Sequence, residues 1–467
     1  MIEITPVLDN KNGKPLYIQL ANYIKQEILS GRIKPKEKLP SKRNLSNYLG
    51  LSLNTIQSAY EQLCAEGYIE SKPRKGLFVT TFDNDIIFNQ RDFEKLESKS
   101  KQVQVNAKID FNSGKVDLEH FPYAIWRKLT IQSLYEDQGE LFYNGNPQGE
   151  LLLREQIAAY LFASRGVRCS AEQIIIGAGT QVLIGLLCML IGKEHIYALE
   201  NPGFHRTRMT LQDLGVHTVS IPLDEDGINI NQLKNTNANV VYVTPSHQFP
   251  YGMIMPISRR MDLLKWAEEK NGYIIEDDYD GEYRYKGKPI PSLQGLDTKE
   301  NVVYLGTFSK SLIPSIRISY MVLPSSLMKK YQEHFTIYKQ TVSRLHQDTL
   351  YRFMENGLWQ SHLNKMRTLY RKKHSTLMLA VKNYLGEKVN IIGEKSGLHI
   401  VLEVKNSMEE DELINTAMNV GVKVYPLSIY YNGTIGSLGC RILLGFGGVS
   451  ETEINTGIRL LKEAWKL

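Results

Sequence analysis

Lys310 is the residue of this sequence best suited to covalent chemistry. It follows the apolar run Asn301–Gly306, which predicts a buried strand, and Thr307, Ser309 and Arg317 stand close to it in the chain. A lysine amine can form a Schiff base with an aldehyde, while hydroxyl and guanidinium groups can bind phosphate. The stretch favours a cofactor that carries both groups, although an ordinary solvated turn fits the same residues.

A second group of side chains favours a pyridine ring in that cofactor. Asp277 ends a strongly apolar run 33 positions before Lys310, and its carboxylate would pair with a protonated ring nitrogen. Tyr279 would hydrogen-bond a ring hydroxyl, and Phe204 would stack on the ring face. Each has an ordinary explanation alone, as a loop carboxylate or a core aromatic. Their joint occurrence in this order, at strand ends, favours the cofactor site.

A glycine-containing turn is the expected phosphate site. Residues 174–181 predict a strand that runs into a helix N-terminus, where the backbone N–H groups and the helix dipole favour an anion. A glycine-rich turn alone is weak support, because many α/β turns carry glycines. The residues of the two stretches expected to bind the cofactor are Gly179, Thr180, Gln181, Thr307, Ser309 and Arg317.

The elements that must position these residues begin at about residue 109. From there apolar strands alternate with helices, which is the pattern of a doubly wound α/β sheet. Polar residues stand at the carboxyl ends of the strands, where open α/β sheets bind ligands. Besides the strand that begins at Ile174, the predicted strands are residues 196–200, 240–244, 273–279 and 302–305.

Composition limits the class of protein. A chain of 467 residues predicts two or three domains, and 42% hydrophobic and 23% charged residues are typical of a globular protein. The first six residues do not resemble a signal peptide, and the longest apolar run, Val182–Ile191, is shorter than the ~20 residues that span a bilayer. We therefore expect a cytoplasmic protein without membrane contact. No metal site is predicted, because the cysteines are scattered, at Cys64, Cys169, Cys188 and Cys440.

The first 80 residues hold most of the net positive charge. They contain twelve Lys or Arg and seven Asp or Glu, a net charge of +5 out of +6 for the whole chain. Such asymmetry suggests a nucleic-acid-binding end, with a solvated basic face as the alternative.

Local signals in residues 10–80 predict a winged helix-turn-helix domain. Apolar positions at helical spacing and serine caps predict three helices, with Leu45, Tyr48 and Leu49 of the second facing inward. Two alternating segments around a basic turn predict the wing. Residues 81–108 are polar and predict a linker. The predicted elements are helices at 14–30, 41–49 and 52–67 and strands at 68–71 and 77–80.

The third helix would enter the major groove of DNA by its N-terminal end. Asn54 would pair with an adenine edge, whereas basic residues would contact phosphates. One such helix covers too little surface for tight specificity, so a dimer is expected. A helical domain that binds protein is the alternative. The residues expected at the DNA are Ser41, Lys42, Arg43, Ser52, Asn54, Thr55, Ser58, Arg74, Lys75 and Gly76.

Two resemblances cover the chain. Residues 14–80 resemble the winged helix of GntR-family regulators, although Leu53 stands where an arginine usually follows the serine of the recognition helix. The remainder resembles fold-type-I pyridoxal-phosphate aminotransferases. Residues 10–467 as a whole are similar to MocR-type regulators of the GntR family, close to the GabR branch. The marks of the GntR resemblance are residues 15–17, 39–45, 59–63 and 66–69, and those of the aminotransferase resemblance are 143–149, 177–181, 244–250, 276–280 and 307–311.

The resemblance implies the fold and the role of each site residue. It implies a mixed, mostly parallel sheet in an aminotransferase-like domain, residues 109–467, whose C-terminal α+β subdomain is residues 346–467. Lys310 would be the internal-aldimine lysine of pyridoxal 5'-phosphate, with Asp277 and Tyr279 as the partners of the ring. Tyr143 would reach the neighbouring subunit's phosphate. That implies a homodimer, head-to-tail and domain-swapped in regulators of this type.

The sequence departs from working aminotransferases at two positions. Phe249 stands where those enzymes usually have an asparagine before the proline. Their carboxylate-binding arginine would align near Leu443, two positions after Arg441, so strand alternation keeps Arg441 as a candidate for the effector carboxylate. Arg206 is the second candidate, since it matches an arginine used for effectors in the GabR branch.

Three functions remain open at this point. The first is a transcriptional regulator that senses an amine or amino acid through the Lys310 aldimine, with at most weak or half-reaction transamination. The second is a functional aminotransferase with an appended DNA-binding domain. The third is a regulator of vitamin B6 synthesis that senses pyridoxal phosphate itself.

Overall fold

The structure is a computed structural model that describes residues 4–6, 8–9, 13–81, 107–136, 139–285, 291–433 and 440–467. The chain divides into two compact units, residues 1–104 and 105–467. Most of the predicted linker, residues 81–108, lies outside the described residues.

The first unit consists of three helices followed by a two-stranded wing. Its elements are α1 (Leu16–Leu29), α2 (Lys42–Leu49), α3 (Leu53–Ala65), β1 (Ile69–Lys72) and β2 (Gly76–Val79). Ser41 and Ser52 cap α2 and α3 as predicted, since each side chain accepts a hydrogen bond from the backbone N–H three residues on. One inward prediction is wrong. Tyr48 is 59% exposed, because the short helix α2 fully buries only Leu45.

The second unit is built on an eight-stranded sheet. Its strands are β4 (Ile174–Gly177), β5 (Ile196–Asn201), β6 (His217–Asp224), β7 (Gly227–Ile228), β8 (Val240–Val243), β9 (Tyr273–Asp278), β10 (Val302–Thr307) and β11 (Ser319–Val322). They lie in the order β4-β11-β10-β9-β8-β5-β6-β7. β11 is antiparallel to β4 and β10, β7 is antiparallel to β6, and the other pairs are parallel. The predicted mixed, mostly parallel sheet is confirmed.

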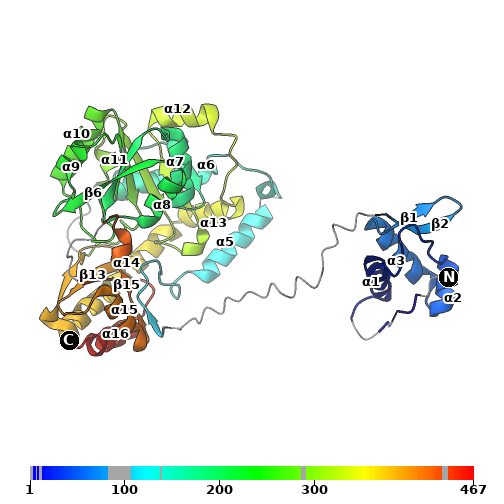
Figure 1. Ribbon diagram of the computed structural model, residues 1–467. Coiled ribbons are helices and arrows are strands. Elements are labelled where there is room, and N and C mark those ends of the chain that lie inside the picture. The colour runs from blue at the N-terminus through cyan, green and yellow to red at the C-terminus, as the bar shows by residue number, and fades with distance from the viewer. Residues whose placement is uncertain are drawn as a thin grey trace. The chain divides into compact units, whose positions relative to one another are not determined.

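Helices pack on both faces of this sheet (Figure 1). One face carries α7 (Thr180–Ile191), α8 (His205–Asp213) and α12 (Ser325–His334). The other side carries α5 (Tyr123–Glu136), α6 (Leu151–Arg165), α9 (Ile230–Lys234), α10 (Ile257–Lys270), α11 (Leu293–Leu296) and α13 (Arg344–Glu355). Side chains alternate along a strand, so Ile275 of β9 joins the core with α7 and Ile274 joins the core with α10. Asp277 and Asp278, which end β9, therefore point to opposite faces.

A smaller antiparallel sheet and three helices form the C-terminal part. Its elements are β12 (Val389–Ile392), β13 (His399–Val404), β15 (Tyr425–Pro426), β16 (Arg441–Gly445), α14 (Leu358–Ala380), α15 (Glu410–Asn419) and α16 (Glu451–Ala464). The sheet order is β12-β13-β16-β15. The helix α14 joins the two parts, because Leu363 packs in the core beneath the large sheet and Tyr370 packs in the C-terminal core.

The start of the second unit also belongs to the C-terminal core. The short strand β3 (Ile109–Asp110) pairs in parallel with β14 (Val422–Lys423), and Phe111 is fully buried beside it. Among the described residues, no helix has the length and apolar character needed to cross a bilayer.

Candidate cofactor pocket and nucleic-acid interface

Lys310 lies three residues beyond the end of β10 and is partly buried. Its Nζ donates a hydrogen bond to the backbone carbonyl of Ser113. Burial lowers the pKa of the Lys310 amine, Asp280 opposes that shift, and the Arg206 guanidinium adds to it. A lowered pKa increases the fraction of neutral amine, which is the form that attacks an aldehyde.

Asp277 is the penultimate residue of β9, the strand next to β10, and lies on the face of the sheet that carries α7 and α8. Its Oδ2 accepts a hydrogen bond from Tyr242. Its buried Oδ1 has no hydrogen-bond partner, and the carboxylate makes no ion pair, within the described part of the chain. Burial raises the pKa of Asp277 to about 7, although the Tyr242 hydrogen bond partly offsets this. A buried carboxylate is stabilised by a cation, so the position suits a protonated pyridine nitrogen.

Sequence reasoning did not single out Tyr242, because a tyrosine inside an apolar strand resembles an ordinary core residue. The signal was present in the alternation along β8. Tyr242 pairs with Ile275 across to β9 and therefore faces the same side of the sheet as Asp277.

Tyr279 is part of a buried hydrogen-bond network. Its Oη lies 2.9 Å from His247 Nδ1 and donates to the His247 carbonyl at 3.0 Å. The same ring nitrogen lies 3.0 Å from both carboxylate oxygens of Asp280. Gln248 instead donates to neighbouring backbone carbonyls. His247, rather than Gln248, is therefore the polar residue beside Tyr279 in the segment where Phe249 replaces the expected asparagine.

Phe204 packs in an aromatic cluster at the same end of the sheet. Its ring is stacked on Phe249, with centroids 4.1 Å apart and planes within 3°, and it meets Tyr279 edge-on at 5.0 Å. Phe249 occupies one face of Phe204, so a cofactor ring can stack only on the opposite face. Nothing in the local sequence indicated this contact, which joins segments 45 positions apart.

The predicted phosphate turn brings Gly179 and Arg317 together. Gly179 caps α7 with a φ of +96°, and a Cβ there would lie 2.0 Å from Arg317 Nη2, so only glycine fits. The guanidinium donates to the Ala178 carbonyl at 3.1 Å. Thr180 is half-buried and Gln181 is exposed in the first turn of α7.

The two predicted hydroxyls have different environments. Ser309 Oγ is buried and has no hydrogen-bond partner among the described residues. Thr307 Oγ1 already accepts hydrogen bonds from the Ser309 backbone at 3.2 Å and from Ser319 Oγ at 2.8 Å. The Arg317 guanidinium at the N-terminus of α7 and the unpartnered Ser309 hydroxyl are donor types that suit a phosphate group.

The remaining predicted residues of the second unit differ in availability. Arg441 donates to Glu403 Oε1 at 2.7 Å and to Tyr251 Oη at 2.6 Å, so its guanidinium is engaged. Arg206 is exposed at the start of α8. Tyr143 is 71% exposed.

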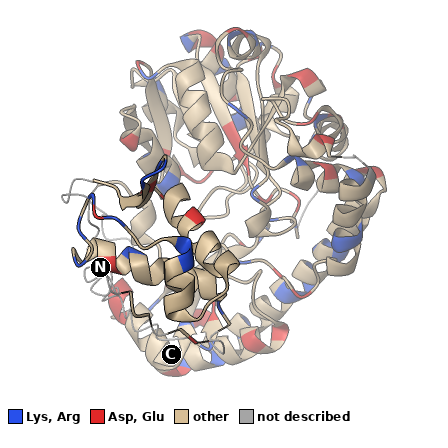
Figure 2. Cartoon of the chain, turned by 90° about the vertical axis from the view of Figure 1, so that its right-hand side faces the viewer, with Lys and Arg blue, Asp and Glu red and all other residues tan. Residues whose placement is uncertain are grey.

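The predicted DNA-contacting residues lie on the surface of the first unit, at α2, at the start of α3 and in the wing turn. Asn54 is exposed, whereas the Ser52 hydroxyl caps α3 by accepting a hydrogen bond from the Thr55 backbone N–H and lies 2.8 Å from the Thr55 hydroxyl. Arg74 and Gly76 have positive φ angles of 61° and 111°, which produce the tight turn between β1 and β2. Figure 2 shows Lys and Arg both on the helices and in the loops of this unit.

Two family models match the chain. The model of bacterial regulatory proteins of the gntR family matches residues 16–79, and that of aminotransferase class I and II matches residues 106–442. The second match covers more than half of the chain.

Individual relatives share this two-part arrangement over most of their length. The chain is 48% identical to the HTH-type transcriptional regulator YdeL of Bacillus subtilis, with 100% of both chains covered. It is 31% identical to the HTH-type pyridoxine biosynthesis transcriptional regulator PdxR of Corynebacterium glutamicum, with 96% of each covered. Among solved structures, an archaeal alanine:glyoxylate aminotransferase is 25% identical with a TM-score of 0.71, covering 80% of this chain and 95% of the other.

Proposed function

The chain belongs to the MocR-type regulators of the GntR family, which carry an aminotransferase class I and II domain, and from this we propose that it binds pyridoxal 5'-phosphate and detects a small amine or amino acid at Lys310. When bound, pyridoxal phosphate supplies an aldehyde that condenses reversibly with primary amines. The observation that carries the proposal is Asp277, a buried carboxylate without a cation among the described residues, on the strand beside the one that leads to Lys310.

The chain's own residues divide the work of holding the cofactor. Asp277 would keep a proton on the ring nitrogen, and the Tyr279 hydroxyl, oriented by its contact with His247, would bind the ring hydroxyl. Ser309, Arg317 and the N-terminus of α7 bind the phosphate. The Lys310 amine would be the group that holds the aldehyde end of the cofactor and for which an effector amine would compete.

Arg206 is the better candidate for binding an effector carboxylate. It is exposed at the start of α8, and its positive charge contributes to the lowered pKa of the Lys310 amine. Arg441 would first have to leave Glu403 and Tyr251. We therefore expect Arg206→Gln to weaken the response to a carboxylate-bearing effector, with Arg208→Gln on the same helix as the matched control.

The second unit is proposed to act as a homodimer. Aromatic side chains that are more than two-thirds exposed occur at Tyr135, Phe142 and Tyr143, and such a surface favours association with a second copy. A ligand shifts the winged helices on DNA only if it binds the two arrangements of the dimer with different affinity. Sedimentation equilibrium of the holoprotein tests the dimer, and monomers at micromolar concentration would contradict it.

The direct test combines chemical trapping with DNA binding. Borohydride treatment of the holoprotein followed by peptide mass spectrometry is expected to place the cofactor mass on Lys310. Fluorescence anisotropy with DNA from upstream of its own and neighbouring genes is expected to change when the correct amine is added. Lys310→Ala should still bind the DNA but lose the response. A response of normal size in Lys310→Ala would refute detection at this lysine.

A second candidate function follows from the similarity to PdxR, which is a pyridoxine biosynthesis regulator by name. In that case the cofactor itself is the effector, and the apo and holo proteins differ in DNA affinity. Titration of pyridoxal phosphate into apoprotein on the operator distinguishes the two, because only direct cofactor sensing gives a change without an added amine. Multiple-turnover release of a 2-oxo acid from a common amino acid would instead identify a working aminotransferase.

A further inference from the structure

A cavity lies beside β9, on the face of the sheet opposite to Asp277. Its volume is about 300 Å³, and arginines dominate its lining. Asp278, which points to this side, accepts a hydrogen bond from Arg165 at 2.6 Å. The cavity therefore lies across the sheet from the candidate cofactor pocket. The lining residues on which the inference depends are Arg165, Ser246, Arg284, Arg367, Arg371 and Ser396.

Two arginines of the lining are held by the protein itself. Arg260 donates to three backbone carbonyls and lies 3.9 Å from Glu276. Arg165 is paired with Asp278 and also donates to Ser246 Oγ. These two arginines fix the wall of the cavity and contribute positive charge, but most of their hydrogen-bonding capacity is used.

The helix α14 supplies two further arginines. Arg367 and Arg371 are four residues apart, so they lie on the same side of the helix. Arg367 donates to the Glu282 carbonyl at 3.1 Å and to Asn364 Oδ1 at 3.3 Å. Neither has an ion pair with any residue that the structure describes, and no side-chain hydrogen bond of Arg371 is found there either. Arg367 and Arg371 therefore bring positive charge to the cavity that no ion pair within the described residues neutralises.

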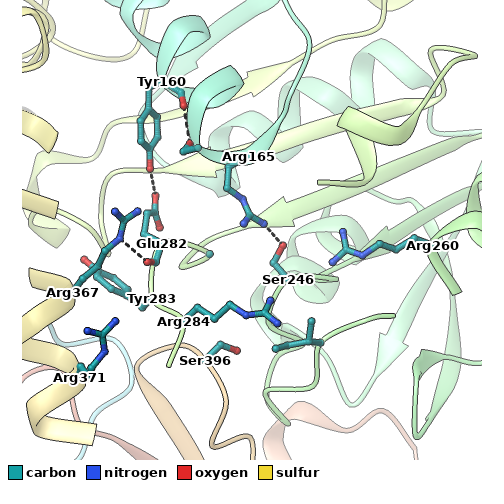
Figure 3. Close-up of a pocket in the computed structure, with 13 residues that line it drawn as sticks. Tyr160, Arg165, Ser246, Arg260, Glu282, Tyr283, Arg284, Arg367, Arg371 and Ser396 are labelled. Carbon is teal, nitrogen blue, oxygen red and sulfur yellow. Dashed lines mark hydrogen bonds between the residues drawn. The ribbon is translucent and has the colours of Figure 1, made fainter. Parts of the chain in front are cut away.

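A buried hydroxyl faces the same space. Ser396 is only 5% exposed, and its Oγ has no hydrogen-bond partner in the described chain. Figure 3 shows Arg284 extending between Arg165 and Ser396 toward Ser246, while Arg367 and Arg371 enter from the α14 side. A buried hydroxyl without a partner costs free energy unless water or a ligand satisfies it.

One acidic side chain also lines the cavity. Glu282 Oε1 accepts a hydrogen bond from Tyr160 at 2.9 Å, and burial raises the pKa of Glu282 to about 7. A carboxylate here opposes an anionic ligand, so its removal should strengthen binding of an anion. Glu282 thus provides a variant with an effect opposite in sign to that of the arginines.

We propose that this cavity is a second ligand site, separate from the cofactor pocket, that binds a small molecule through a phosphate group. Guanidinium groups and hydroxyls are the donors that bind phosphate oxygens best, and the cavity is of the size of a small metabolite site. Because Ser246 belongs to the large-sheet part and α14 packs in both cores, a bound ligand would bridge the two parts of the second unit.

Calorimetric titration of the full-length holoprotein at fixed ionic strength tests the site. Inorganic phosphate and glucose 6-phosphate are the two probes, which distinguish a free anion from a phosphate ester. We expect saturable binding of at least one probe. Arg371→Gln should weaken it about tenfold or more, since a hydrogen bond to a charged group is lost. Ser396→Ala should also weaken it, Glu282→Gln should strengthen it, and Lys372→Gln on the same helix should leave it unchanged.

Three outcomes would overturn the proposal. The first is no saturable binding of either probe at concentrations on the order of 10 mM. The second is binding that Arg317→Gln abolishes and Arg371→Gln leaves intact, which would place the phosphate in the cofactor pocket. The third is weaker operator binding by Arg371→Gln in a protein that binds neither probe, which would assign the arginines to DNA.

Discussion

The two carboxylates that end β9 are neighbours in the chain but have opposite surroundings. Each has one buried oxygen without a hydrogen-bond partner in the described residues. Asp278 is nevertheless paired with a cation, because Arg165 Nε lies 2.6 Å away. Asp277 receives only the Tyr242 hydroxyl. One side of the strand therefore has a buried anion that lacks a cation, and the other has a surplus of cations around a cavity. Because side chains alternate along β9, one strand contributes to a site that favours a cation on one face of the sheet and to a site that favours an anion on the other.

The largest effect on the Asp277 side is expected from Lys310→Ala. Without the amine the holoprotein should lose the near-visible absorption band of the lysine-linked cofactor completely. Unfolding should be little changed, because within the described residues the Lys310 side chain makes one hydrogen bond, to Ser113. Absorption spectra and circular dichroism check both parts. The control is Lys330→Ala, because Lys330 also donates a hydrogen bond to a backbone carbonyl, that of Leu190. If Lys310→Ala kept the absorption band, the cofactor would not be linked to Lys310, and the Asp277 side would lose its assignment as the cofactor site.

The next largest effect is expected on the free energy of unfolding, where substitutions of Asp278 and Asp277 should differ. Asp278→Asn leaves the buried Arg165 guanidinium without its partner, which typically costs about 3 kcal/mol or more. Asp277→Asn in the cofactor-free protein removes a buried charge that has no cation, so it should be neutral or stabilising. Urea unfolding of the two apo variants measures the difference. Equal destabilisation by both substitutions would contradict the comparison.

The pH dependence of the apoprotein gives a third test. Burial raises the pKa of Asp277 from its ordinary 3.8 to about 7, so the folded state holds this proton more tightly than the unfolded state does. Stability should therefore fall as the pH rises from about 4 to about 7 and then level off. Burial also raises the pKa values of Glu200 and Glu276 to about 7, so these two carboxyl groups should likewise lower the stability as the pH rises.

Thermal melts of apoprotein between pH 5 and pH 8 measure this decline, and Asp277→Asn should reduce its slope. Bound cofactor should reverse the contribution of Asp277, because a ring cation favours the ionised carboxylate. An unchanged slope in the variant would show that Asp277 does not titrate in this range.

Much of the Asp277 side could be predicted from sequence, whereas the Asp278 side could not. Lys310 and Asp277 each follow an apolar run whose end marks the carboxyl edge of the sheet, so the local pattern predicts that both lie at that edge. The arginine cavity joins Arg165, Arg284 and Arg371, which are contributed by three separate segments with no shared motif. Only tertiary packing brings them together, and each is an ordinary charged residue in its own segment.

The smallest expected effect comes from the two tyrosines that bond these carboxylates. Tyr242→Phe removes the hydroxyl that donates to Asp277, and Tyr304→Phe removes the one that donates to Asp278 Oδ2 at 2.7 Å. A single hydrogen bond to a charged group is worth about 1.5–3 kcal/mol. In apoprotein Tyr242→Phe should lower the free energy of unfolding more than Tyr304→Phe does, because Asp278 still has Arg165 as a partner whereas Asp277 has no other partner in the described part of the chain. Cofactor should narrow that gap, since the ring cation would then act on Asp277 as Arg165 acts on Asp278. Urea unfolding of both variants with and without pyridoxal phosphate measures it, and a gap that cofactor leaves unchanged would mean that Asp277 is not the group facing the ring.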